Sequence, residues 1–159
     1  MGYRRSPLRG AFYAPNVMPH TFTHLLTQII FSTKDRRPFL AAKLKARLFP
    51  YLGGIIRAHD GKALIINGPA DHLHILASLS QKHALADLMC ELKADSSGWV
   101  HKTFPNQKTF AWQIGYGAFS VSHSNLPEVE KYIADQEEHH RKISFQEKFV
   151  AFLKKHEIE

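Results

Sequence analysis

The pattern of apolar and polar residues along the chain predicts four strands. Residues 21–32 are rich in β-branched and aromatic residues, and their apolar side chains fall on both faces, as in a central strand. The other strands are expected at 62–67, 71–79 and 110–122. The turn sequence NGPAD joins the first two of these, which predicts an antiparallel hairpin. Two glycines in the last one predict a bend or a bulge.

Apolar residues at helical spacing predict four helices. They are expected at 39–58, from the possible N-cap Ser80 to about Trp99, from Asn125, and from Ser144. Pro50 lies inside the first helix and predicts a kink or a break there. The last helix has an apolar stripe that must be buried against this subunit or another, formed by Phe145, Phe149, Phe152 and Leu153.

The order of these elements is β-α-β-β-α-β, followed by two C-terminal helices. This order is typical of the split β-α-β arrangement of ferredoxin-like domains, an α+β class in which one antiparallel sheet carries two helices on one face. The other face of the sheet is expected to be free. Residues 1–19 are basic and contain several prolines and glycines, so we expect a poorly ordered arm before a single domain at 20–159.

Composition narrows the function classes. The chain has 159 residues and a formal net charge of +7, which favours a polyanionic partner such as nucleic acid. The single cysteine, Cys90, excludes an intramolecular disulfide and any site built from several cysteines. No apolar run is long enough for a membrane span, and the N-terminal residues lack the apolar segment of a secretory signal. We therefore expect a cytoplasmic protein.

Two of the eleven histidines, His72 and His74, lie one residue apart in a predicted strand. Strand alternation places both imidazoles on one face, where they could bind one metal ion, while the intervening apolar residues face the core. An isolated H-x-H pair is a weak motif, and taken alone it more often marks ordinary histidines at the surface or the rim of the sheet. A third ligand could come from His24, from Asp71 or from the third helix.

The third predicted helix carries Tyr132 and Gln136 four residues apart, so the two side chains lie on the same side of the helix. A tyrosine on an amphipathic helix more often packs than reacts. The residues alone therefore leave open whether Tyr132 packs or reacts.

Five segments taken together resemble one known family. They are FSTKDRRPF, DHLHIL, ELKADSSGWV, WQIGYGAFSVS and YIADQEEHHRK, within a resemblance that covers roughly residues 18–156. This combination resembles the single-tyrosine HUH transposases of the insertion-sequence 200/605 group, including their relatives associated with repetitive extragenic palindromes. The resemblance implies that His72, His74 and Gln136 bind a divalent metal ion, Mg²⁺ or Mn²⁺. It also implies that Tyr132 is the catalytic nucleophile.

The same resemblance implies a metal-assisted DNA transposase, which cleaves and rejoins single-stranded DNA through a 5′-phosphotyrosine intermediate. The substrate would be single-stranded DNA with hairpin ends, and the enzyme a homodimer. We hypothesise that Tyr132 of one subunit acts in trans with the histidines of its partner. Phosphate contacts are expected from basic residues after the first strand and in the second helix, namely Lys34, Arg36, Arg37 and Lys93. The alternative for these four is a solvated basic face.

Three other functions are alternatives to this one. A domesticated descendant could bind DNA hairpins without transposing and still retain Tyr132. A non-catalytic RNA-recognition module would stack bases on strand aromatics, which DHLHILAS lacks. A two-histidine phosphoesterase would need two H-x-[ST] motifs, and this chain has one H-x-H and no second copy.

Overall fold

The computed structural model describes residues 22–136, so the N-terminal arm and the helix expected from Ser144 lie outside the described residues. The strands are β1 (Leu25–Ser32), β2 (Lys62–Asn67), β3 (His72–Leu79) and β4 (Gly117–Ser120). The helices are α1 (Ala42–Ala58), α2 (Leu85–Thr103) and α3 (Leu126–Ala134), with short 3-10 turns η1 (Lys34–Arg36), η2 (Pro105–Gln107) and η3 (His123–Asn125). No helix in this part of the chain is long and apolar enough to cross a membrane.

The strands form one antiparallel sheet in the order β2-β3-β1-β4. β1 pairs with β3 on one side, with Ser32 opposite His72, and with β4 on the other, with Ile29 opposite Ala118. β1 is thus central, as its apolar residues on both faces predict. The split β-α-β arrangement and the α+β class are confirmed.

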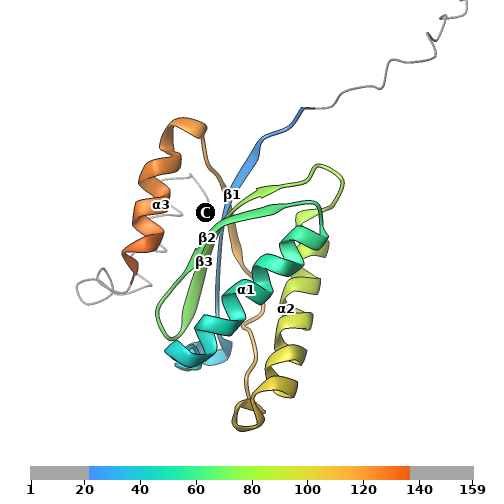
Figure 1. Cartoon of the computed structure of the whole chain (residues 1–159), viewed down its shortest axis with the longest axis vertical. Coiled ribbons are helices and arrows are strands. Elements are labelled where there is room, and N and C mark those ends of the chain that lie inside the picture. The colour runs from blue at the N-terminus through green and yellow to red at the C-terminus, as the bar shows by residue number, and fades with distance from the viewer. Residues whose placement is uncertain (1–21, 137–159) are drawn as a thin grey trace, which may run out of the picture.

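Helices α1 and α2 cover one face of the sheet (Figure 1). Between them and the sheet lies the main apolar core, which includes Ile29, Phe31, Leu44, Leu48, Leu52, Ile56, Leu73, Ile75, Met89, Leu92 and Val100. The helical residues of this core recur at three- and four-residue intervals, and the strand residues at two-residue intervals. Burial of these faces therefore holds both helices on the sheet.

Pro50 does not break α1, which continues for 17 residues through it. A proline has no N–H to donate to the carbonyl four residues earlier, here that of Ala46. Both Pro50 and Ala46 are exposed, so water can solvate that carbonyl. The helix is kept by its buried face, on which Leu48 and Leu52 flank the proline.

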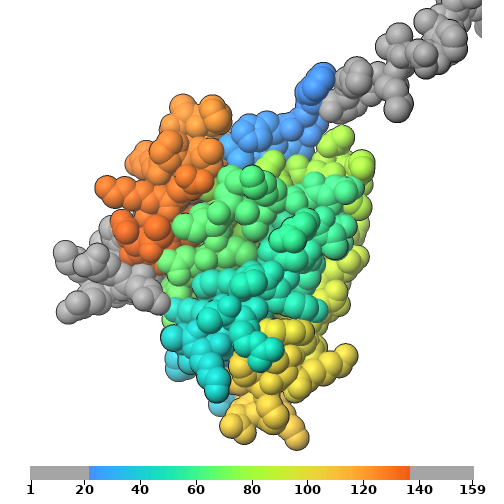
Figure 2. All heavy atoms as spheres, viewed as in Figure 1, coloured from blue at the N-terminus to red at the C-terminus, as the bar shows by residue number. Residues whose placement is uncertain are grey.

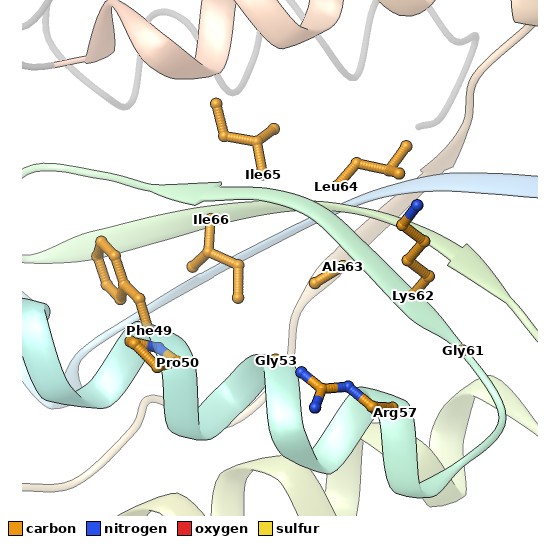
Figure 3. A pocket seen from close by; sticks show the side chains of 10 residues that line it. All are labelled: Phe49, Pro50, Gly53, Arg57, Gly61, Lys62, Ala63, Leu64, Ile65 and Ile66. Carbon is orange, nitrogen blue, oxygen red and sulfur yellow. The ribbon is translucent and has the colours of Figure 1, made fainter.

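The expectation that the second face of the sheet is free is wrong. α3 packs on β2 and β3 there, with Ile133 fully buried (Figures 1 and 2). A β-bulge between Ala63 and Ile65 interrupts the alternation of β2. As a result Leu64 and Ile65 both point away from α1, toward α3, while Ile66 points toward α1 (Figure 3). These two apolar side chains supply part of the surface that α3 covers.

Two predicted boundaries need correction. α2 begins at Leu85 rather than after Ser80, because the Ser80 hydroxyl accepts a hydrogen bond from the Lys82 N–H and forms a turn instead of a cap. The last strand is much shorter than 110–122. Trp112 makes an isolated bridge with Thr33, and the chain then leaves the sheet and rejoins it at β4.

Candidate active site

His72 and His74 lie on β3, on the face that α3 covers. Their side chains are 0% and 2% exposed, and their ring centroids are 5.3 Å apart. Burial of both rings argues against ordinary histidines at a solvated rim. The alternation of β3 thus presents two adjacent imidazoles on the face of the sheet opposite the main core.

α3 brings Tyr132 to the same place. Its ring packs edge-on against that of His74, with centroids 5.7 Å apart. Gln136 follows one turn later and is fully buried. The Gln136 Nε2 donates to the Tyr132 carbonyl at 3.0 Å, so the amide oxygen is the atom that could coordinate a metal ion. The two halves of the predicted site, about 60 residues apart in sequence, therefore meet within one chain.

Asn67, the last residue of β2, holds the end of α3. Its Nδ2 donates to the carbonyls of Ile133 and Ala134, each at 2.9 Å. Carbonyls in the last turn of a helix have no partner within the helix, so this side chain satisfies two of them. The contact fixes the turn of α3 that carries Tyr132 against the sheet.

His72 is oriented by a carboxylate that is itself held by an arginine. Its Nδ1–H donates to Asp71 Oδ1 at 2.7 Å, and Arg36 donates to Asp71 Oδ2 through Nε at 3.0 Å and Nη2 at 2.6 Å. Burial opposes ionisation of Asp71, but the hydrogen bonds from His72 and Arg36 outweigh it and hold the pKa of that carboxyl below its ordinary value. The arrangement leaves Nε2 of His72 as the nitrogen that could bind a metal ion.

His74 has a different partner, the side-chain amide of Gln28. Gln28 is 1% exposed, and its Nε2 lies 3.3 Å from His74 Nδ1. With the amide oxygen turned toward the ring, Nδ1–H would donate and Nε2 would be the ligand nitrogen. Gln28 was not among the predicted site residues. Its signal in the sequence is an amide side chain in the middle of a mostly apolar central strand.

The donor set fits a divalent ion. Two neutral imidazoles and one amide oxygen are the kinds of ligand that Mn²⁺ and similar ions accept. Among residues 22–136, no group of three or more His, Cys, Asp or Glu side chains is placed to hold a metal. The predicted set contains only two such side chains, because its third member is an amide.

The other candidate ligands lie elsewhere or act indirectly. His24 packs against His123, near the end of β1 opposite to the one paired with His72. Asp71 contacts the Nδ1 of His72 and so orients this imidazole. Of the three, the third helix brings a ring into contact with the histidine pair, that of Tyr132 against His74.

The four predicted phosphate contacts divide into two groups. Arg36 is bound to Asp71, and Lys93 donates to the backbone carbonyls of Gln113, at 2.9 Å, and Gly115. Lys34 and Arg37 are exposed on either side of Arg36. The geometry therefore favours Lys34 and Arg37 for contacts with a phosphate backbone, and gives Arg36 and Lys93 structural contacts.

Replacing Asp71 with alanine should weaken metal binding about 10- to 100-fold, because His72 would lose the acceptor that orients its ring. A Mn²⁺ titration followed by electron paramagnetic resonance measures this directly. The matched control is Asp60→Ala, which removes an exposed carboxylate paired with Lys82 on another part of the surface. Equal Mn²⁺ affinity in the two variants would contradict a positioning role for Asp71.

One hollow in the described structure lies away from this site. It measures about 690 Å³ and lies between α1 and the free edge of β2, lined by residues such as Phe49, Gly53 and Arg57 (Figure 3). None of its lining residues is a predicted site residue. The candidate chemistry is therefore at the α3 face and not in this groove.

A model of the family described as "Transposase IS200 like" matches residues 21–136. The chain belongs to the IS200-like transposase family. The match spans every residue of the candidate site, from Gln28 to Gln136. No curated protein matches this IS200-like transposase.

Two solved structures resemble this IS200-like transposase in fold. One is described as a transposase from Deinococcus radiodurans R1, with a TM-score of 0.61 and 21% identity, over 76% of this chain and 96% of the other. The second is the structure of a REP-associated tyrosine transposase bound to a REP hairpin. Its TM-score is 0.59 at 13% identity, over 80% of this chain and 75% of the other. Both similarities agree with the ferredoxin-like arrangement described above.

Proposed function

We propose that this transposase cleaves and rejoins single-stranded DNA with Tyr132 as the nucleophile, through a 5′-phosphotyrosine intermediate. The observation that carries the proposal is the contact between the Tyr132 ring and His74, 5.7 Å between centroids, in a member of a transposase family. A buried histidine pair and a tyrosine on a neighbouring helix provide a nucleophile beside groups that can hold a phosphate-activating ion.

The reaction would exchange one phosphate ester for another. Tyr132 Oη forms a bond to phosphorus and loses its proton, while the bond from phosphorus to the 3′-oxygen breaks and that oxygen gains a proton. The DNA 5′-phosphate is then attached to the tyrosine, and the other fragment ends in a free 3′-hydroxyl. Attack of a different 3′-hydroxyl on the phosphotyrosine reverses these changes and joins two strands without ATP.

His72, His74 and Gln136 would hold the metal ion, Mg²⁺ or Mn²⁺. When bound, such an ion supplies positive charge that polarises the phosphate and stabilises the leaving oxygen. All three ligands are neutral, so they do not cancel that charge. Asp71 and Gln28 would keep the two imidazoles oriented toward it.

The substrate would be single-stranded DNA with hairpin ends, bound by a homodimer. The REP hairpin bound to one structural relative supports the hairpin, and the net charge of +7 supports a nucleic-acid partner. Each chain has one Tyr132 and so forms one covalent DNA end at a time. Joining the two ends of an element therefore calls for two subunits.

The test is a covalent-adduct assay with the purified full chain. Hairpin oligonucleotides with randomised single-stranded flanks, labelled at either the 5′ or the 3′ end, are incubated with Mn²⁺ and run on a denaturing protein gel. The 3′ label is expected to move with the protein, and the 5′ label to appear in a shorter free fragment. A 5′ label on the protein would contradict the proposed polarity. Hairpin binding without any adduct would favour the domesticated hairpin-binding alternative.

A further inference from the structure

The segment WQIGYGAFSVS contains an exposed apolar loop that the proposed chemistry does not use. Among the described residues, the exposed large apolar side chains are Phe22, Leu25, Ile114 and Tyr116. Two of these four belong to the loop 113–116, with Ile114 95% exposed and Tyr116 40% exposed. A loop that presents a nearly fully exposed isoleucine beside a partly exposed tyrosine is a candidate contact surface.

The loop is held in place by a partly buried cation. The Lys93 ammonium donates to the Gln113 and Gly115 carbonyls and lies 5.8 Å from the centre of the Tyr116 ring. Burial lowers the pKa of Lys93, as expected for an ammonium removed from water into this position. Gly115 has a φ of +85°, which allows the sharp turn that exposes Ile114. Lys93 therefore fixes the backbone on both sides of the exposed Ile114.

The loop is joined to η1, the basic turn that lies beside the candidate active site. The Lys34 N–H donates to the Ala111 carbonyl at 2.8 Å, and the Asp35 N–H to Gln113 Oε1 at 3.1 Å. At the other side of η1, Arg36 binds Asp71, the residue before His72. At one end of the sheet, a surface thus runs from the buried histidines across exposed cations to the apolar loop.

A groove lies between the loop and α2. Its volume is about 510 Å³, and its lining includes Met89, Cys90, Lys93, Trp112, Ile114 and Tyr116. Its walls are mostly apolar, whereas the neighbouring turn carries the exposed cations Lys34 and Arg37. Apolar and aromatic side chains next to a row of cations are the pattern by which proteins bind single strands, since bases pack on the former and phosphates on the latter.

We propose that the loop 113–116 and this groove bind an unpaired base of the single-stranded DNA substrate, with Lys34 and Arg37 contacting the flanking phosphates. The proposal rests on the proposed function, and it names the surface that the strand follows after leaving the active site. A paired base cannot enter the groove because its faces are stacked, so the contact selects single strands.

Cys90 is a built-in probe of the groove, because it is exposed there and is the only cysteine of the chain. The rate at which a thiol reagent modifies Cys90 is measured with the unmodified protein, alone and with a saturating single-stranded oligonucleotide. The strand is expected to slow the reaction several-fold, and the same sequence as a blunt duplex is expected not to. An unchanged rate with bound single strand would overturn the proposal.

Substitution separates base contacts from phosphate contacts. Ile114→Ala is expected to weaken single-strand binding on the order of 10-fold with an unchanged salt dependence. Lys34→Ala is expected to lower the slope of log K against log salt by about one. Since Ile114 is 95% exposed, its loss should not affect folding. The matched control is Leu25→Ala, an exposed apolar residue at the far end of β1.

The alternative occupant of this surface is a second copy of the chain. If Ile114→Ala changes self-association in sedimentation velocity but leaves DNA affinity unchanged, the proposal is overturned in favour of that contact. The adduct assay is independent of both measurements. Protection of Cys90 without an adduct would contradict only the proposed tyrosine chemistry. An adduct without protection would contradict only the proposed binding of DNA in the groove.

Discussion

Tyr132→Phe should abolish the covalent DNA adduct while leaving the protein folded. The change removes one hydroxyl oxygen, and the phenyl ring can keep its edge-on packing against His74. Without the oxygen no ester to phosphorus can form, and loss of a nucleophile typically costs a rate factor on the order of 10⁴ or more. The measurement is the labelled-adduct assay, with the melting temperature as a check on folding.

The control for this variant is a second partly buried tyrosine whose ring also packs on a neighbouring ring. Tyr51 stacks on Trp99 with ring centroids 4.7 Å apart, and it lies on α1, on the other face of the sheet. Tyr51→Phe removes the same atom and should leave adduct formation at the wild-type level. An adduct that persists in Tyr132→Phe would move the nucleophile to a different residue.

Local patterns were sufficient to predict the order of the strands and the first two helices along the chain, but not the short length of β4 or the start of α2. The hairpin of β2 and β3 followed from a turn sequence between two apolar runs, and the central place of β1 from apolar residues on both its faces. Such features depend on neighbours within a few residues. The continuation of α1 through Pro50 was not predictable in this way, because it depends on how strongly the flanking leucines are buried.

The second face of the sheet shows more clearly what local sequence patterns cannot predict. The sequence indicated an amphipathic helix at Tyr132, but not which surface it would cover. That choice depends on the bulge in β2 that turns Leu64 and Ile65 toward α3, and on the hydrogen bonds from Asn67 to the end of the helix. Both are contacts between distant segments, and neither leaves a periodic pattern in the sequence.

The candidate site likewise contains residues that the sequence could predict and residues that it could not. The residues alone placed His72 and His74 together, and the family resemblance supplied their roles with Tyr132 and Gln136. Asp71 was considered as a ligand, and the structure places it as the support of His72. Gln28 was missed, because its pairing with His74 depends on the register between β1 and β3. Supporting residues of this kind are defined by geometry across strands and not by spacing along one of them.

His72→Ala should abolish metal-dependent adduct formation. Removing an orienting partner of a metal ligand already costs about 10- to 100-fold in affinity, and removing the ligand itself should cost more. The Asp71–Arg36 pair would remain, so the turn η1 should keep its position. Mn²⁺ titration should show weakened binding, with His24→Ala, a histidine that packs against His123, as the matched control. Unchanged Mn²⁺ affinity in His72→Ala would remove this residue from the ligand set.

Mixing His72→Ala with Tyr132→Phe then shows which subunit completes each site. Each variant lacks one half of the site, and random pairing in a dimer would restore about a quarter of the sites if the halves came from different chains. In the described structure Tyr132 lies against His74 of its own chain, with Asn67 holding α3 in that place. We therefore expect the mixture to stay inactive. Restored adduct formation would instead show that α3 reaches the partner's histidines. That result would support the hypothesis, drawn from the sequence, that the site is assembled in trans.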